Sequence, residues 1–73
     1  MSDPVSNETH LDVNDHEISG TMIDLGGNFM RSIGKAFRYA DAVNQVRLKE
    51  AFAHEWDEYA RLTTARKRIG AVR

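Results

Sequence analysis

The residues that could bind a phosphate group are glycines near the middle of the chain. Residues 26–37 read GGNFMRSIGKAF, whose glycines and Gly-Lys pair suggest a loop that wraps a phosphate with backbone N–H groups. Such a loop requires a glycine, four other residues, and then Gly-Lys-Ser/Thr. Here Phe29 occupies the first glycine position, and Ala36 stands where a hydroxyl would meet magnesium. The spacing argues against a nucleotide site, and a helix explains the segment better.

Three histidines with neighbouring carboxylates are the other candidates for chemistry. His10 and His16 lie among acids that could ligate a metal, but their separation fits no HxxxH or HExxH spacing. His54 has Glu50 and Glu58 at helical spacing, which could serve proton transfer and is also common on solvated helix faces. No serine has a partnered base, and the chain contains no cysteine. We therefore expect no enzyme, no catalytic residues, no metal site and no cofactor.

Charge is distributed unevenly along the chain. Residues 1–24 contain six acids and neither lysine nor arginine, whereas residues 25–73 contain five acids and ten bases. This division indicates an acidic segment ahead of a basic module, although the net charge is only −1. Because the apolar residues of residues 1–19 are too sparse for a core, this segment is predicted to be a flexible, disordered acidic arm.

Apolar periodicity predicts a helix after the arm. From Met22 onward, apolar residues recur every three or four positions, which is typical of one buried helix face. Thr21 followed by Asp24 resembles a capping pair, and Asn28 is an alternative N-cap. Gly34 either allows a neighbouring helix to approach closely or is a tolerated surface glycine.

A second helical segment is predicted to begin after Asp41, which is a good N-cap. It spans residues 42–65 as one long helix, or as two helices that break near residues 53–54. The predicted fold is all-α: a helical hairpin or three short helices in residues 20–66, followed by a basic tail of residues 67–73. The predicted core consists of Phe29, Ile33, Phe37, Leu48, Phe52, Trp56 and Tyr59.

The small size of the chain suggests that its fold is stabilised by binding a partner. Seventy-three residues allow one small domain, whose core rarely supplies more than ~3–5 kcal/mol. The sequence has no run of about 18 apolar residues, and its N-terminus lacks the basic and apolar regions of a secretion signal. We expect a cytoplasmic protein that does not bind membranes.

Protein binding is the favoured function, because aromatic and methionine side chains exceed what so small a core can hide. This binding would form a homodimer or engage a different protein. The residues predicted to be shared between core and interface are Phe29, Met30, Trp56 and Tyr59. The acids predicted to add a second contact are Asp12, Asp15 and Glu17.

Nucleic-acid binding is the alternative, because clustered bases contact phosphates. Three bases recur at i, i+4 and i+7 of the first predicted helix, and the C-terminal ARKRIGAVR adds four more. The candidate residues are Arg31, Lys35, Arg38, Arg66, Lys67 and Arg68. Added salt should weaken such binding steeply, whereas a hydrophobic protein interface should tolerate salt.

The stretch GNFMRSIGKAFRYADAVNQVRLKEAF, residues 27–52, resembles a pattern in small, mostly uncharacterised phage and prophage proteins. In that pattern a glycine-aromatic start leads through an alanine-rich helix to Ala-Asp, an Asn, a Leu and Ala-Phe. The matching positions are Gly27, Phe29, Ala40, Asp41, Asn44, Leu48, Ala51 and Phe52. The resemblance implies a phage accessory protein, in the host cytoplasm, that binds and inhibits a host or defence protein. It carries no catalytic residues.

Overall fold

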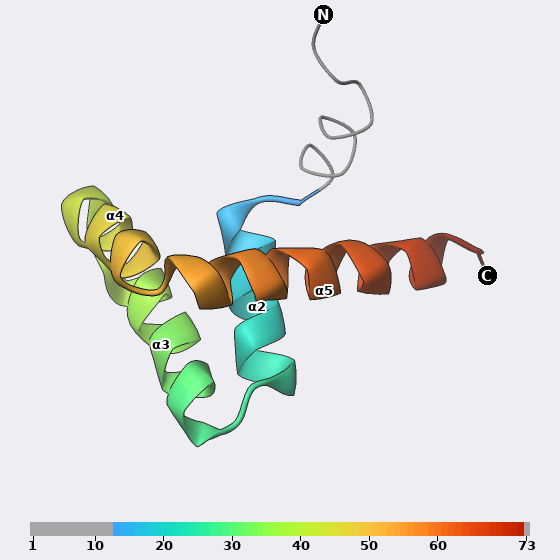
Figure 1. Ribbon diagram of the computed structural model, residues 1–73, viewed down its shortest axis with the longest axis horizontal. Coiled ribbons are helices and arrows are strands. Elements are labelled where there is room, and N and C mark those ends of the chain that lie inside the picture. The colour runs from blue at the N-terminus through green and yellow to red at the C-terminus, as the bar shows by residue number, and fades with distance from the viewer. Residues whose placement is uncertain (1–12, 73) are drawn as a thin grey trace, which may run out of the picture.

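Helices make up nearly all of the chain that the structure describes. The computed structural model describes residues 13–72. Their helices are α2 (Asp15–Leu25), α3 (Asn28–Tyr39), α4 (Ala42–Ala51) and α5 (Ala53–Val72) (Figure 1). No strand occurs in this range, and the predicted all-α class is confirmed.

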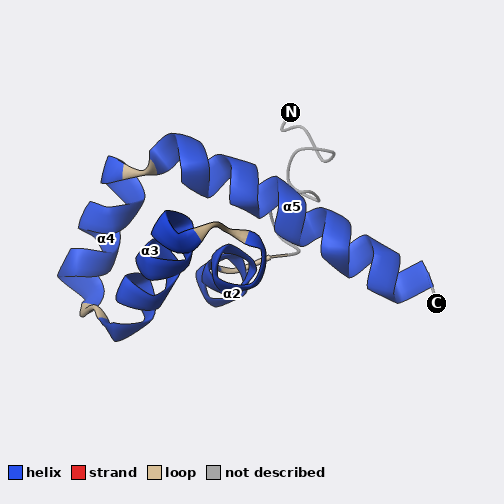
Figure 2. Ribbon diagram, turned by 90° about the horizontal axis from the view of Figure 1, so that it is seen from below, coloured by secondary structure: helices blue, strands red, loops and turns tan. Residues whose placement is uncertain are grey.

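Two neighbouring helices and one long crossing helix define the architecture. Helices α2 and α3 lie side by side in opposite directions, joined by a tight corner at residues 26–27 (Figure 1). Helix α4 follows the far end of α3, and α5 then crosses α2 (Figure 2). The C-terminal half of α5 extends beyond the other three helices.

The core is small and draws on three helices. Ile18 and Met22 come from α2, Phe37 from α3 and Trp56 from α5. The rings of Phe37 and Trp56 are tilted against each other, with centroids 4.7 Å apart. Side chains of this size contribute about 1.5–3 kcal/mol each when fully buried. Partly buried side chains surround them: Val13, Met30, Ile33, Leu48, Tyr59 and Ala60.

The predicted core was correct for Phe37 and Trp56 and wrong in two other respects. It omitted Ile18 and Met22, of which Met22 has no exposed surface at all. It included Phe29, which is 62% exposed at the start of α3. The omission has a physical reason: the buried side of α2 is narrow, and its other two buried residues are the polar Ser19 and Thr21.

Helix α2 begins earlier than the sequence predicted. Its N-cap is Asn14, whose side chain accepts from the backbone N–H of Glu17 at 2.8 Å, while the Glu17 carboxylate accepts from the Asn14 N–H at 3.0 Å. This capping box satisfies two backbone donors. The expected cap at Thr21 is wrong, since Thr21 is buried in the middle of the helix. Residues 15–19 of the predicted arm are thus helical, and Asp12 lies outside the described residues.

The second half of the chain forms two helices rather than one. Asp41 caps α4 by accepting from the Asn44 N–H at 2.9 Å, as predicted. The helix breaks at Phe52, one residue before the expected position. Helix α5 then continues through the predicted tail to Val72, so the boundary expected after residue 66 is wrong. The Thr63 hydroxyl donates to the carbonyl of Tyr59 at 2.6 Å, within the helix, and does not interrupt it.

Candidate functional site

Exposed aromatic and aliphatic side chains gather at the corner between α2 and α3 and along the first half of α5. The rings of Phe29 and Phe52 meet edge to face, with centroids 5.7 Å apart. Tyr59 is half-buried and Leu62 is 43% exposed, one turn further along α5. We call Phe29, Phe52, Tyr59 and Leu62 the apolar strip. It brings together residues that are far apart in the chain, from three different segments.

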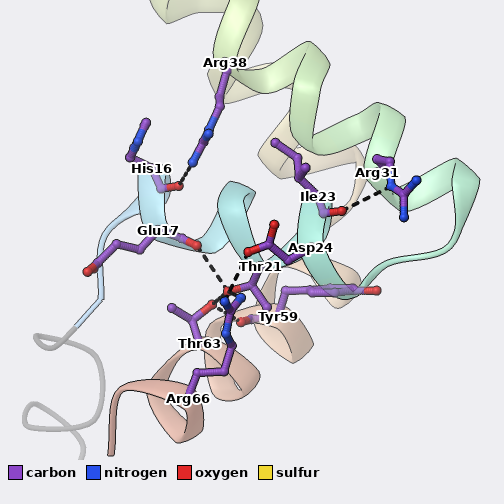
Figure 3. Close-up of polar contacts among 10 residues, drawn as sticks. All are labelled: His16, Glu17, Thr21, Ile23, Asp24, Arg31, Arg38, Tyr59, Thr63 and Arg66. Atoms are coloured by element: carbon purple, nitrogen blue, oxygen red, sulfur yellow. Dashed lines mark hydrogen bonds and ion pairs between the residues drawn. The ribbon is translucent and has the colours of Figure 1, made fainter. Parts of the chain in front are cut away.

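The corner at Gly26 connects the two halves of the strip. A Cβ atom at Gly26 would lie 3.3 Å from the Tyr59 hydroxyl and 2.7 Å from the Cβ of Met30. The nearest neighbour of such a Cβ would be the Met22 carbonyl oxygen, at 2.5 Å, so glycine permits the tight corner between α2 and α3, with the Tyr59 hydroxyl of α5 close by. The ring of Tyr59 extends toward this corner (Figure 3). Leu25, 56% exposed on the α2 side of the corner, adds apolar surface there.

A shallow hollow of about 410 Å³ borders the strip on α5. Its walls are Glu58, Tyr59, Arg61 and Leu62. Arg61 forms an ion pair with Asp57, one turn away, so the charge beside the hollow is compensated. The hollow offers an apolar floor with a polar edge, which is the usual anatomy of a protein contact surface.

The predicted interface residues divide between this strip and the core. Phe29 and Tyr59 lie on the strip, and Met30 packs against the core from beside it. Trp56 is only 6% exposed, and its indole N–H donates to the Asp15 carboxylate at 3.1 Å. Trp56 is therefore a core residue, and almost none of its surface is exposed for the interface contact that was predicted.

The predicted acidic contacts are used within the chain. Asp15 forms an ion pair with Lys49 at 2.9 Å in addition to its bond with Trp56. Glu17 closes the capping box and pairs with Lys67 at 3.0 Å. The backbone N–H of Asn14, and then Lys67, lower the pKa of Glu17 because both stabilise its ionised form. Both carboxylates are thus already paired with bases of the same chain.

The predicted basic residues are not gathered on one open face. Arg31 donates to the carbonyl of Ile23 at 3.2 Å, across the α2–α3 pair. Arg38 and Arg66 reach α2 from opposite sides, and Lys67 pairs with it as well (Figure 3). Lys35 and Arg68 point to solvent on different helices. Four of the six predicted basic residues therefore contact α2 of the same chain.

Two residues of the strip were assigned to packing or left out by sequence reasoning. Phe52 was predicted to lie in the core, and Leu62 was not predicted as an interface residue. On α5, Trp56 turns into the core, while Tyr59 is half-buried and Leu62 is exposed. The surplus of aromatic residues in the sequence indicated an exposed aromatic surface. It did not indicate which of these residues form that surface.

Comparisons with protein-family models, with curated proteins and with solved structures found no match to this chain. Among the described residues, none of the helices has both the length and the apolar character needed to span a membrane. In the same part of the chain, no three His, Cys, Asp or Glu side chains are grouped closely enough to hold a metal ion.

Proposed function

We propose that this chain is a protein-binding module and that the apolar strip is its contact surface. The observation that carries the proposal is the exposed Phe29 ring, packed edge to face against Phe52 and continued by Leu62. Aromatic side chains at the centre of a polar-rimmed patch are the residues that dominate binding energy in protein interfaces. The resemblance of residues 27–52 to phage accessory proteins supports the same class of function.

The magnitude available from Phe29 is large for one residue. A phenylalanine buries about 200 Å² when fully covered, and 62% of this ring side chain is still exposed. Covering about 125 Å² at about 25 cal/mol per Å² is worth roughly 3 kcal/mol. This corresponds to about a hundredfold in a dissociation constant.

The occupant that we propose for the strip is a second copy of the chain. Within residues 13–69 only four apolar side chains are buried, and α4 buries none of its residues. Chains of this length commonly supplement so small a core by oligomerisation. A homodimer that covers the strip would add apolar burial that a monomer lacks. The alternative occupant of the strip is a host or phage protein that the module inhibits.

Light scattering over a dilution series tests the proposal. Wild type is expected to form a dimer, and Phe29→Ala is expected to weaken it about a hundredfold or more. Tyr39→Ala is the matched control, because Tyr39 is an even more exposed aromatic residue on the same helix, ten positions from Phe29. Equal weakening by both substitutions would overturn the role of the strip. A wild-type chain that stays monomeric throughout would exclude the second copy as occupant.

A further inference from the structure

Three basic side chains close around α2 from both sides, and we call Arg38, Arg66 and Lys67 the basic clasp. Arg38 comes from α3 and donates to the Ser19 hydroxyl at 2.9 Å and to the His16 carbonyl at 2.8 Å. Arg66 and Lys67 come from α5, and Arg66 reaches α2 from the side opposite to Arg38 (Figure 3). The three bases therefore flank a single helix that lies between them.

The two bases from α5 are held by carboxylates of α2. Arg66 pairs with Asp24 at 3.1 Å and also donates to the Thr21 hydroxyl at 3.2 Å, and Lys67 pairs with Glu17 at 3.0 Å. Between these pairs lies an open hollow of about 320 Å³, lined also by Gly20, which presents no side chain. The hollow is thus a polar site whose positive groups are already occupied by anions from the same chain.

These ion pairs are weak enough to be exchanged. All four charged side chains retain between 36% and 57% of their surface. Exposed pairs of this kind contribute little to stability and are screened by salt. A nucleic-acid backbone offers closely spaced phosphates and gains free energy from the release of its counterions. Phosphates can therefore compete with two isolated carboxylates for the same bases.

We propose that the α5 side of the basic clasp, Arg66 and Lys67, is a latent nucleic-acid site, which Glu17 and Asp24 keep closed as internal competitors. The site takes the phosphate backbone of a duplex, and Arg68 extends it along the exposed end of α5. A membrane surface is less suited to it, because an interfacial helix needs an apolar face beside its bases. Between residues 63 and 69, Ile69 is the one large apolar side chain that is exposed. The apolar strip plays no part in this site.

The test is the affinity for a fluorescent random-sequence DNA duplex at low salt. Glu17→Gln/Asp24→Asn removes the carboxylates that pair with Lys67 and Arg66 and raises the net charge by two. Glu50→Gln/Asp57→Asn is the matched control, because it changes the net charge equally and releases Arg61 outside the clasp. The first variant is expected to bind at least about tenfold more tightly, with a salt dependence of slope near −2.7 for about three phosphate contacts. Equal affinity of the two variants would overturn the proposal.

Further variants keep the test decisive if the double substitution disturbs the fold. Glu17 also closes the capping box, so Asp24→Asn alone is the second variant, and helicity is checked by circular dichroism. It frees Arg66 and is expected to bind the duplex more tightly than Asp57→Asn. Adding Arg66→Gln should return the affinity to the control level. Binding to phosphatidylserine vesicles without binding to the duplex would overturn the proposal in favour of a membrane surface.

Discussion

The contact between α2 and α3 depends on Gly34, and its replacement by alanine tests how closely the two helices approach. Gly34 is buried in the middle of α3. A Cβ atom there would lie 2.8 Å from the Ser19 carbonyl oxygen, 3.0 Å from the Cβ of Met22 and 3.1 Å from Cγ1 of Ile23. All three distances are shorter than a comfortable contact of about 3.5 Å. Of the two explanations of Gly34 that the sequence allowed, close helix approach is the correct one.

Two effects of Gly34→Ala oppose each other. Alanine favours the helical state by about 0.8–1.0 kcal/mol relative to glycine. Forcing an extra methyl group into a well-packed contact costs about 1–3 kcal/mol. The upper part of that range applies, because the Ser19 carbonyl belongs to the backbone of α2 and cannot rotate away. The net expectation is a loss of about 1–2 kcal/mol, which lowers the melting temperature of a domain of this size by roughly 5–15 °C.

Gly20→Ala is the control, because Gly20 is also inside a helix but faces a different neighbour. Its Cβ would meet only the guanidinium group of Arg38, at 2.9 Å, and that flexible end can move. Thermal unfolding at one fixed protein concentration should show an unchanged or higher melting temperature for Gly20→Ala and a lower one for Gly34→Ala. If both substitutions raised the melting temperature equally, α2 and α3 would not be packed as closely as the structure shows.

Three further predictions concern the polar contacts of the fold. The hydroxyl groups of Thr21 and Thr63 form a buried pair, 2.6 Å apart, and Thr63→Val should lower the free energy of unfolding in urea by about 1–3 kcal/mol. Thr21→Val should lower it less when it is added to Thr63→Val than when it is made in the wild type. Folding lowers the pKa of Glu17 below 4.5, the value in the unfolded chain. The ionised carboxylate therefore stabilises the fold fully above pH 4.5, and this stabilisation is lost as the pH falls through the pKa of the folded state. Glu17→Gln should therefore flatten the decline of the unfolding free energy in acid. Asp41→Ala should cost about 0.5–2 kcal/mol and selectively speed amide exchange in the first turn of α4.

The sequence predicted local features well where one short-range signal decided them. Asp41 followed by Ala42 gave a correct N-cap, because a carboxylate that accepts from an N–H three residues later needs no tertiary support. The start of α2 was misplaced, although Asn14 and Glu17 also have capping-box spacing. That signal was overlooked because the residues after it are polar and acidic. Their burial depends on α3 and α5, which the local sequence does not reveal.

The uneven distribution of charge is evident in the sequence, but the partners of these charged residues could not be inferred from it. The acids near the N-terminus and the bases near the C-terminus were predicted to contact other molecules. In the structure Glu17 pairs with Lys67, and Asp24 pairs with Arg66. These partners are more than forty residues apart in the chain, and only the crossing of α5 over α2 brings them together. A charge division along a sequence thus indicates an electrostatic contact without saying whether it lies within one chain or between two.

The apolar strip and the basic clasp share α5, and this arrangement predicts that they act independently. Leu62 belongs to the strip, whereas Thr63, the next residue, contacts Thr21 of α2. Consecutive residues point about 100° apart around a helix, so the two surfaces lie on different sides of α5. Phe29→Ala should therefore leave the duplex affinity of Glu17→Gln/Asp24→Asn unchanged, and the latter should leave self-association unchanged. Loss of both activities through Phe29→Ala in a chain of unchanged helicity would contradict this independence, because it would show that duplex binding requires the dimer.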